Sequence, residues 1–164
     1  MPRSSADCLD PSTAPELCVH QIRSRFVGAD MLRPGNGCMV SGDANACANV
    51  TRIAEEYGGY FDLMYAAAHC HSPACISVEL WNDDTHTLIC RNEPIYGAGA
   101  HQHDEVGFAV GIPPCLWGSA AEGLNLPPRL HLSSNLTTIK RANSTYTHWG
   151  VMALWQMRVA YISG

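Results

Sequence analysis

The sequence predicts an all-β fold, a β-sandwich or jelly roll that carries an irregular, disulfide-stapled N-terminal segment. Residues 75–90 alternate apolar and polar side chains around a turn, and residues 97–129 contain too many glycines and prolines for a long helix. The 164 residues suffice for one hydrophobic core but not comfortably for two. We therefore expect an irregular, Cys-rich segment over residues 1–48 and a β-sandwich domain over residues 49–164.

The individual elements follow from local patterns. Residues 1–48 are rich in Pro, Gly, Ser, Asp and Cys and show little periodicity, which is typical of an irregular segment. Residues 75–81 and 87–90 predict a β-hairpin, because turn residues separate them. Residues 136–140 predict a further strand. The apolar run 149–162 fits a helix or a strand, and its β-branched and aromatic end favours a strand.

Charge and hydropathy exclude two classes of partner. The formal net charge is −5, and no run of Lys or Arg occurs. Because nucleic acid phosphates need clustered cations, we expect no nucleic acid partner. No apolar stretch approaches the roughly 20 residues of a membrane helix, so we expect no membrane span.

Cysteine usage indicates an oxidising compartment. An even number of cysteines without a CxxC pair favours structural disulfides over a zinc ribbon or a thioredoxin site. We therefore expect a secreted or lumenal protein, with the disulfide connectivity left open. The eight cysteines are Cys8, Cys18, Cys38, Cys47, Cys70, Cys75, Cys90 and Cys115.

Three N-x-S/T sequons agree with that compartment and predict a glycoprotein. They begin at Asn49, Asn135 and Asn143. The first ten residues contain no apolar segment of the kind a signal peptide needs. We therefore expect the chain to be a mature form or a fragment, unless the secretory interpretation is wrong.

The sharpest chemical feature is the motif His69-Cys70-His71. On an extended strand, side chains two positions apart point to the same face, so both imidazoles would converge while Cys70 points away. Imidazole suits copper, zinc, iron or nickel. The alternative is a pair of unrelated surface histidines beside a structural cysteine.

Other histidines give weaker signals. His101 and His103 form a second HxH motif in a glycine-rich stretch, where a shared face is not required and a solvated loop is the simpler interpretation. His148 precedes the last predicted strand. No P-loop, HExxH, nucleophile elbow or dinucleotide motif is present in the sequence.

Four short motifs follow one another between residues 65 and 162. HCH at 69–71 is followed by LICRNEP at 88–94, by THWG at 147–150, and by a strand with a methionine and a tyrosine. This order resembles the second copper-binding domain of the ascorbate-dependent copper monooxygenases, which include the peptidylglycine α-hydroxylating and dopamine β-monooxygenases.

The resemblance implies a jelly roll that holds copper through His69, His71 and Met157, or through Met152 in a gapped alignment. Two imidazoles and a thioether suit Cu(I) and O₂ chemistry, with ascorbate as the reductant. In that family, a second copper domain is required, and residues 1–60 are too short to supply it. The resemblance therefore implies half an enzyme that pairs with other chains, or a domain repurposed for binding. Ala67 replaces the family's peptide-binding arginine, so amidation of peptides is not expected.

Two rival functions stay open. The first is a disulfide-stabilised secreted binding or structural module without metal, in which the histidines are incidental. The second is a zinc hydrolase that uses one HxH motif, although no Glu is placed as an obvious general base.

Overall fold

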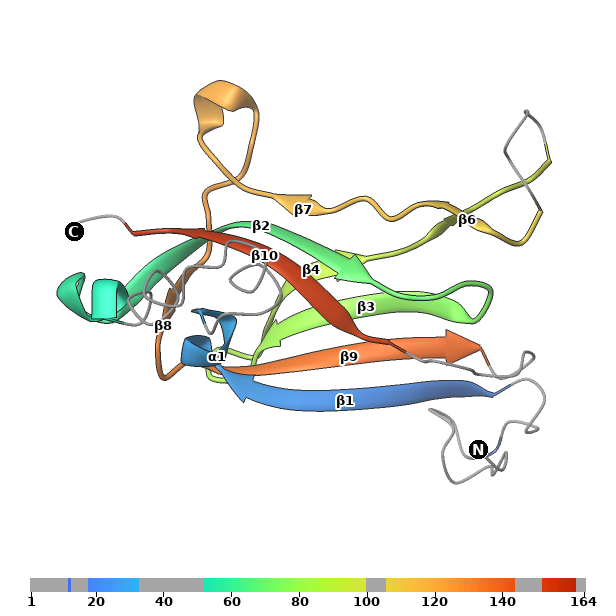
Figure 1. The fold of residues 1–164 in the computed structure, drawn as a ribbon, viewed down its shortest axis with the longest axis horizontal. Coiled ribbons are helices and arrows are strands. Elements are labelled where there is room, and N and C mark those ends of the chain that lie inside the picture. Colours follow the sequence, from blue (N-terminus) through green and yellow to red (C-terminus); the bar gives the residue numbers. More distant parts are fainter. Residues whose placement is uncertain (1–11, 13–17, 33–51, 100–105, 144–151, 162–164) are drawn as a thin grey trace, which may run out of the picture.

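Two antiparallel sheets face each other in the computed structural model of the chain (Figure 1). The structure describes residue 12 and residues 18–32, 52–99, 106–143 and 152–161. Within these residues the elements are mostly strands, and the few helices are short. The predicted all-β sandwich is confirmed.

The first sheet has four strands in the order β1-β9-β3-β4. Their bounds are Val19–Val27 (β1), Asn135–Asn143 (β9), Cys75–Asn82 (β3) and Thr87–Asn92 (β4). Strands β3 and β4 form the predicted hairpin. Asn82 stabilises its turn, because the side-chain oxygen accepts hydrogen bonds from the backbone N–H groups of Asp84 and Thr85.

The second sheet is built around β2, which pairs with β10, β7 and β8. The bounds are Tyr60–His69 (β2), Leu154–Ala160 (β10), Cys115–Leu116 (β7) and Arg129–His131 (β8). The apolar run near the C-terminal end of the sequence therefore forms a strand, as its β-branched residues predict. Two short strands outside both sheets, β5 (Ile95–Tyr96) and β6 (Ala109–Gly111), pair with each other.

The described helical segments are short. They are α1 (Gly28–Leu32), residues 52–56 and the 3-10 helix η3 (Ala120–Glu122). A turn precedes β2, where Gly58 and Gly59 adopt φ angles of 70° and 80° that side chains disfavour. None of the described helices is long and apolar enough to cross a membrane.

The main core lies between the two sheets. Phe61 and Leu63 of β2 lie in one buried cluster with Leu80 of β3 and Leu136 of β9. The helical segments contribute further apolar side chains to this cluster. Its buried members are Leu32, Ala54, Phe61, Leu63, Ala66, Leu80, Cys90, Leu130 and Leu136.

A β-bulge in β2 decides which of its side chains face this core. Leu63 pairs with Val159 of β10, but Tyr65 pairs with the adjacent Arg158, so β2 has one extra residue at Met64. The side chains of β2 in the main core change from odd positions before the bulge, Phe61 and Leu63, to an even position after it, Ala66. As a consequence, the later part of β2 turns its odd positions outward, including His69.

The prediction that residues 1–48 are irregular is wrong for residues 19–27. These residues form β1 and pair with β9 along its full length. The sequence pattern is weak there, because the polar Ser24 stands between Ile22 and Phe26 on the face that these apolar side chains share. The predicted boundary at residue 49 lies outside the described residues.

Candidate functional site

The imidazoles of His69 and His71 converge where β2 ends. Their Nε2 atoms lie 3.1 Å apart, and the ring centroids are separated by 5.0 Å with nearly perpendicular planes. Both side chains are exposed, whereas Cys70 between them is buried. The alternation expected of an extended segment therefore brings the two rings together and turns the cysteine inward.

A disulfide fixes the backbone beside this pair. Cys70 is bonded to Cys75, the first residue of β3, so the connection between β2 and β3 is closed over five residues. Cys70 and Cys75 also belong to a second small buried cluster with Ala68 and Val78. The histidine pair therefore lies on a short connection that is anchored at both ends.

Asn92, the last residue of β4, holds the same end of β2 from the opposite sheet. Its buried side-chain oxygen accepts a hydrogen bond from the backbone N–H of Ala68 at 2.6 Å. Its side-chain nitrogen donates to the sulfurs of Cys90 and Cys115, at 3.3 and 3.6 Å. A buried backbone donor next to His69 is thereby satisfied, which fixes the position of the strand end.

The disulfide Cys90–Cys115 joins the two sheets. Cys90 belongs to β4 and Cys115 to β7, and the bond closes a segment of 25 residues that contains β5 and β6. Cys18 is also disulfide-bonded, and no described cysteine is free. Both described bonds thus connect the first sheet to the second, Cys70–Cys75 at the end of β2 and Cys90–Cys115 between β4 and β7.

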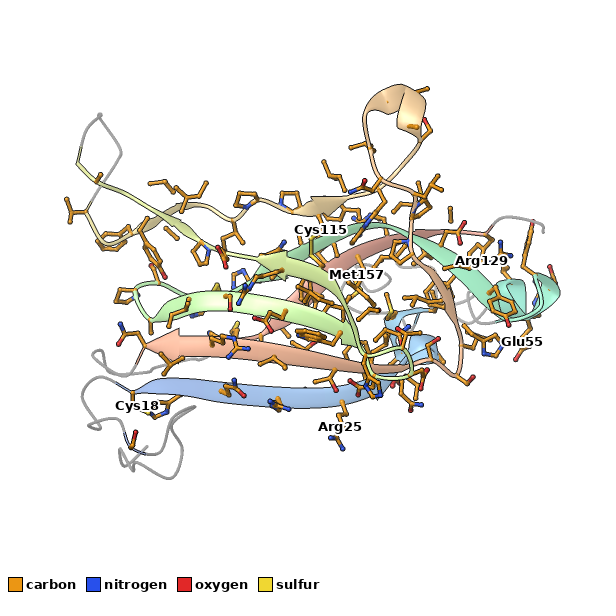
Figure 2. The ribbon with its side chains drawn as sticks, turned by 180° about the vertical axis from the view of Figure 1, so that it is seen from behind. Cys18, Arg25, Glu55, Cys115, Arg129 and Met157 are labelled. Carbon is orange, nitrogen blue, oxygen red and sulfur yellow. A yellow bond between two sulfur atoms is a disulfide. The ribbon has the colours of Figure 1, made fainter. Side chains whose placement is uncertain are left out.

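The structure places Met157, the first of the two predicted methionine ligands, away from the histidine pair. Met157, labelled in Figure 2, lies opposite Ala66 and packs against the main core. His69 lies opposite Leu154, and its side chain is exposed on the outer face. Directly opposed residues of antiparallel strands share a face, so the thioether of Met157 and the imidazole of His69 lie on different faces of the sheet.

The structure does not test Met152 or the remaining candidate histidines as ligands. The side chain of Met152 is partly exposed, and its backbone carbonyl accepts a hydrogen bond from the Lys140 ammonium at 2.8 Å. Its role as a ligand stays a prediction. His101, His103 and His148 lie outside the described residues.

Sequence reasoning missed the buried carboxylate of Glu79 on the outer face of the first sheet. Arg91 and Arg141 lie 2.8 and 3.0 Å from it, and the indole N–H of Trp81 donates to it at 2.9 Å. Burial raises the pKa of Glu79, but the hydrogen bonds from Arg141 and Trp81 and the two guanidinium charges outweigh burial and lower the pKa. The signal in the sequence is one acid within an otherwise uncharged strand.

Lys140 is a second buried charge, on the inner side of β9. Its cross-strand partner on β3 is Val78, which is fully buried, and desolvation by this burial lowers the pKa of Lys140. The hydrogen bond to the Met152 carbonyl ties β9 to the segment that leads into β10. Lys140 therefore holds the segment just before β10, the strand that pairs with β2 up to His69.

Within the described residues, no group of three or more His, Cys, Asp or Glu side chains could hold a metal ion.

One family model, described as Stress up-regulated Nod 19 (SURNod19), matches residues 36–162. No curated protein matches the chain, and no solved structure matches it.

The family match corrects the resemblance to copper monooxygenases. The expectations of a copper protein and of a monooxygenase-like domain are wrong, since the matching family is a different one and the described residues contain no such metal cluster. With a match over most of its length, the chain belongs to the SURNod19 family.

Proposed function

We propose that this chain is an extracytosolic binding module whose β-sandwich is braced for an oxidising compartment. The disulfide between Cys90 and Cys115 carries this proposal, because it joins the two sheets across the core. Disulfides of this kind persist where the environment is oxidising and are rare where glutathione keeps thiols reduced.

The arrangement of the braced regions supports binding as the role. The disulfides and Asn92 fix one end of the sandwich, and the surface beside it presents the exposed histidine pair. Rigid elements that present exposed side chains lower the entropy lost when a partner binds. The braced end is therefore suited to hold a recognition surface in one conformation.

Trapping of thiols in intact cells tests the compartment. Cells that make the full chain are treated with N-ethylmaleimide, lysed, reduced, and labelled with a polymer-linked maleimide that retards the protein on a gel. We expect the polymer-linked maleimide to label at least the four cysteines Cys70, Cys75, Cys90 and Cys115. Cysteines in disulfides do not react with N-ethylmaleimide and become free thiols only after reduction. A chain whose four thiols are blocked before reduction would contradict the proposal.

A second candidate function, the binding of a zinc ion, rests on the distance between the two imidazoles. Zinc–imidazole bonds are about 2.0–2.1 Å long, so two nitrogens 3.1 Å apart subtend an angle of about 98° at a shared ion. This angle lies near the roughly 109° of a tetrahedral site. The distance between the two nitrogens therefore allows His69 and His71 to bind one ion, and water or a partner's side chain would complete the coordination.

Titration of the full chain with zinc chloride, followed by calorimetry in buffer free of chelators, tests this second function. The variant His69→Ala/His71→Ala should lose the binding. His86→Asn is the matched control, because His86 is exposed in the β3–β4 turn with a φ of 56°, which Asn tolerates. Equal zinc binding by the double variant and the original chain would contradict the site.

A further inference from the structure

Strand β1 has one edge with which no described element pairs. It stands at the end of the order β1-β9-β3-β4, and all nine of its residues pair with β9 on the other side. Figure 1 shows β1 at the margin of the molecule, with no described element beyond it. The edge strands β4 and β10 have six and seven residues and pair with a register shift, whereas the pairing of β1 has none. A long, regular edge without proline is a template for an added strand.

The hydrogen bonds near the end of β1 show which of its backbone groups face the free edge. The N–H of Val27 donates away from β9, to the carboxylate of Asp30 at 3.0 Å. The next N–H, that of Gly28, donates across to the residue before β9 at 2.9 Å. Backbone groups of an antiparallel strand point to alternate sides, residue by residue. The N–H and C=O groups of Arg23 and Arg25 therefore point at the free edge, as those of Val27 do.

The same two residues place positive charges at this edge. Arg23 and Arg25 are exposed and share the outer face, because side chains two positions apart on a strand point the same way. Figure 2 shows the Arg25 side chain directed away from the other elements. No ion pair of the described residues involves either guanidinium. Arg23 has a neutral partner, since the side-chain oxygen of Gln21 accepts its hydrogen bond at 3.0 Å.

The carboxylates of the outer face are engaged by other groups. Glu79 binds Arg91 and Arg141, and Glu93 binds Arg91 as well. Asp83, in the turn after β3, accepts a hydrogen bond from a threonine of β9 at 2.6 Å. The two arginines of β1 therefore keep uncompensated positive charges, in a chain whose formal net charge is −5.

These two charges select what can pair with the edge. In an antiparallel pair of two copies of β1 centred on Ser24, Arg23 of each chain lies opposite Arg25 of the other. A pair centred on either arginine places two copies of that arginine opposite each other. Like charges directly opposite each other are destabilising, whereas opposite charges stabilise the pair. A strand with Asp or Glu at two alternate positions therefore fits this edge, and a second copy of β1 does not.

The inner face adds an apolar requirement. Ile22 shares this face with Phe26, which packs against the main core, yet Ile22 is 41% exposed. An added strand places one side chain directly opposite Ile22, and an apolar side chain there buries this surface. In an antiparallel strand the fitting sequence is acidic–any–acidic–apolar, read against β1 from Arg25 back to Ile22.

We propose that β1 binds an extended segment of another protein by strand addition, with two acidic residues at alternate positions opposite Arg23 and Arg25. This inference rests on the proposed function and deepens it, since it names the partner chemistry of the binding module. Backbone hydrogen bonds supply affinity in this mode of binding, and the alternate side chains supply selectivity.

Titration of the full chain into fluorescein-labelled peptides, followed by fluorescence anisotropy, tests the strand addition. The probe peptide Ser-Thr-Glu-Thr-Glu-Val-Thr-Ser carries the proposed pattern. The matched control Ser-Thr-Glu-Glu-Thr-Val-Thr-Ser has the same composition and charge, but its adjacent glutamates point to opposite faces. We expect saturable binding of the probe and about threefold weaker binding of the control, because only one of its glutamates can lie opposite an arginine. Equal affinities would mean attraction by net charge alone and would overturn the inference.

Methylation of the probe's backbone nitrogens tests the pairing of the main chains. Methyl groups on the nitrogens of both glutamates remove the N–H groups that face β1, so this peptide should not bind. A methyl group on the nitrogen of the threonine between them removes an N–H that points away from β1, so this peptide should keep the probe's affinity. Equal behaviour of the two methylated peptides would contradict strand addition.

Variants of the chain locate the binding edge. Arg25→Thr should weaken binding of the probe about threefold, and Arg23→Thr/Arg25→Thr about tenfold. Arg158→Thr is the matched control, because Arg158 is exposed on the edge strand β10, and it should leave the affinity unchanged. Equal affinities of Arg25→Thr and Arg158→Thr would overturn the assignment to β1. Melting curves verify that the exposed positions tolerate threonine, which favours strands.

Two further measurements separate the remaining outcomes. Sedimentation velocity should show a monomer, and a dimer whose formation the probe peptide blocks would overturn the inference in favour of a second copy. Absence of saturable probe binding by the full chain would overturn it as well. If thiol trapping finds disulfides but the probe does not bind, strand addition fails and the proposed compartment stands. If the thiols are free and the probe binds, the compartment fails and strand addition stands.

Discussion

The two disulfides at this end of the sandwich differ in the length of chain that they close. Cys70–Cys75 closes the short connection between the consecutive strands β2 and β3, whereas Cys90–Cys115 joins β4 to β7, with a sequence separation of 25. In the chain-entropy model, closure of the shorter segment contributes about 2 kcal/mol and closure of the longer about 3.5 kcal/mol. The comparison indicates that the long-range bond stabilises the whole fold and the short one orders the histidine pair.

The largest effect is expected when the bond between the sheets is removed. The variant Cys90→Ser/Cys115→Ser should lower the free energy of unfolding by about 3.5 kcal/mol, because the unfolded chain regains the freedom of the 25-residue segment. Urea denaturation followed by circular dichroism measures the loss. A loss smaller than that of the Cys70 and Cys75 variant would contradict the ranking.

Removal of the short disulfide should have a smaller global effect and a clear local one. We expect Cys70→Ser/Cys75→Ser to lower the free energy of unfolding by about 2 kcal/mol, since the bonded pair has a sequence separation of only five. The same variant should bind zinc more weakly, because the backbone that carries His69 and His71 is no longer anchored. Unchanged zinc affinity would show that the disulfide does not order the pair.

Asn92 provides a noncovalent link between the same regions. The variant Asn92→Ala leaves the buried N–H of Ala68 without its acceptor and should lower the free energy of unfolding by about 1.5 kcal/mol. Asn125→Ala is the matched control, because Asn125 is exposed. Equal stabilities of the two variants in urea would mean that the inter-sheet hydrogen bond contributes nothing measurable.

The smallest effect concerns pH and the outer face of the first sheet. The pKa of Glu79 is lower in the folded chain than in the unfolded chain, so the unfolded chain binds a proton at this carboxylate more readily. The contacts of the ionised Glu79 therefore stabilise the fold fully above about pH 4.3, the ordinary pKa of Glu. This stabilisation is lost as the pH falls through the folded pKa. Glu79→Gln should therefore unfold with a weaker dependence on pH in this acidic range. Denaturation curves at several pH values measure the slope. Glu55→Gln, at an exposed position in the helical segment 52–56, is the control and should leave the slope unchanged.

Local sequence patterns predicted much of the fold. The alternation over residues 75–81, the turn residues after it and the β-branched end of the last strand all act within a few residues of the elements they define. The same is true of the converging imidazoles of His69 and His71, which follow from the two-residue period of an extended segment.

The parts of the candidate site that depend on how distant strands pair could not be predicted from the sequence. The bulge at Met64 inverts the inward positions of β2, and the sequence alone does not reveal a single extra residue in a paired strand. That bulge places Ala66 and its partner Met157 toward the core and His69 outward. Likewise, the contact between Asn92 and Ala68 joins residues 24 positions apart, which no local pattern indicates.

Mass spectrometry of peptides from the unreduced protein tests the central claim, that a disulfide joins the two sheets. The protein is purified with its thiols blocked and digested without reductant. The account predicts one linked pair of peptides containing Cys90 and Cys115, and a fragment in which Cys70 and Cys75 remain joined. Maleimide on Cys90 or Cys115, or a bond from either to another cysteine, would contradict it.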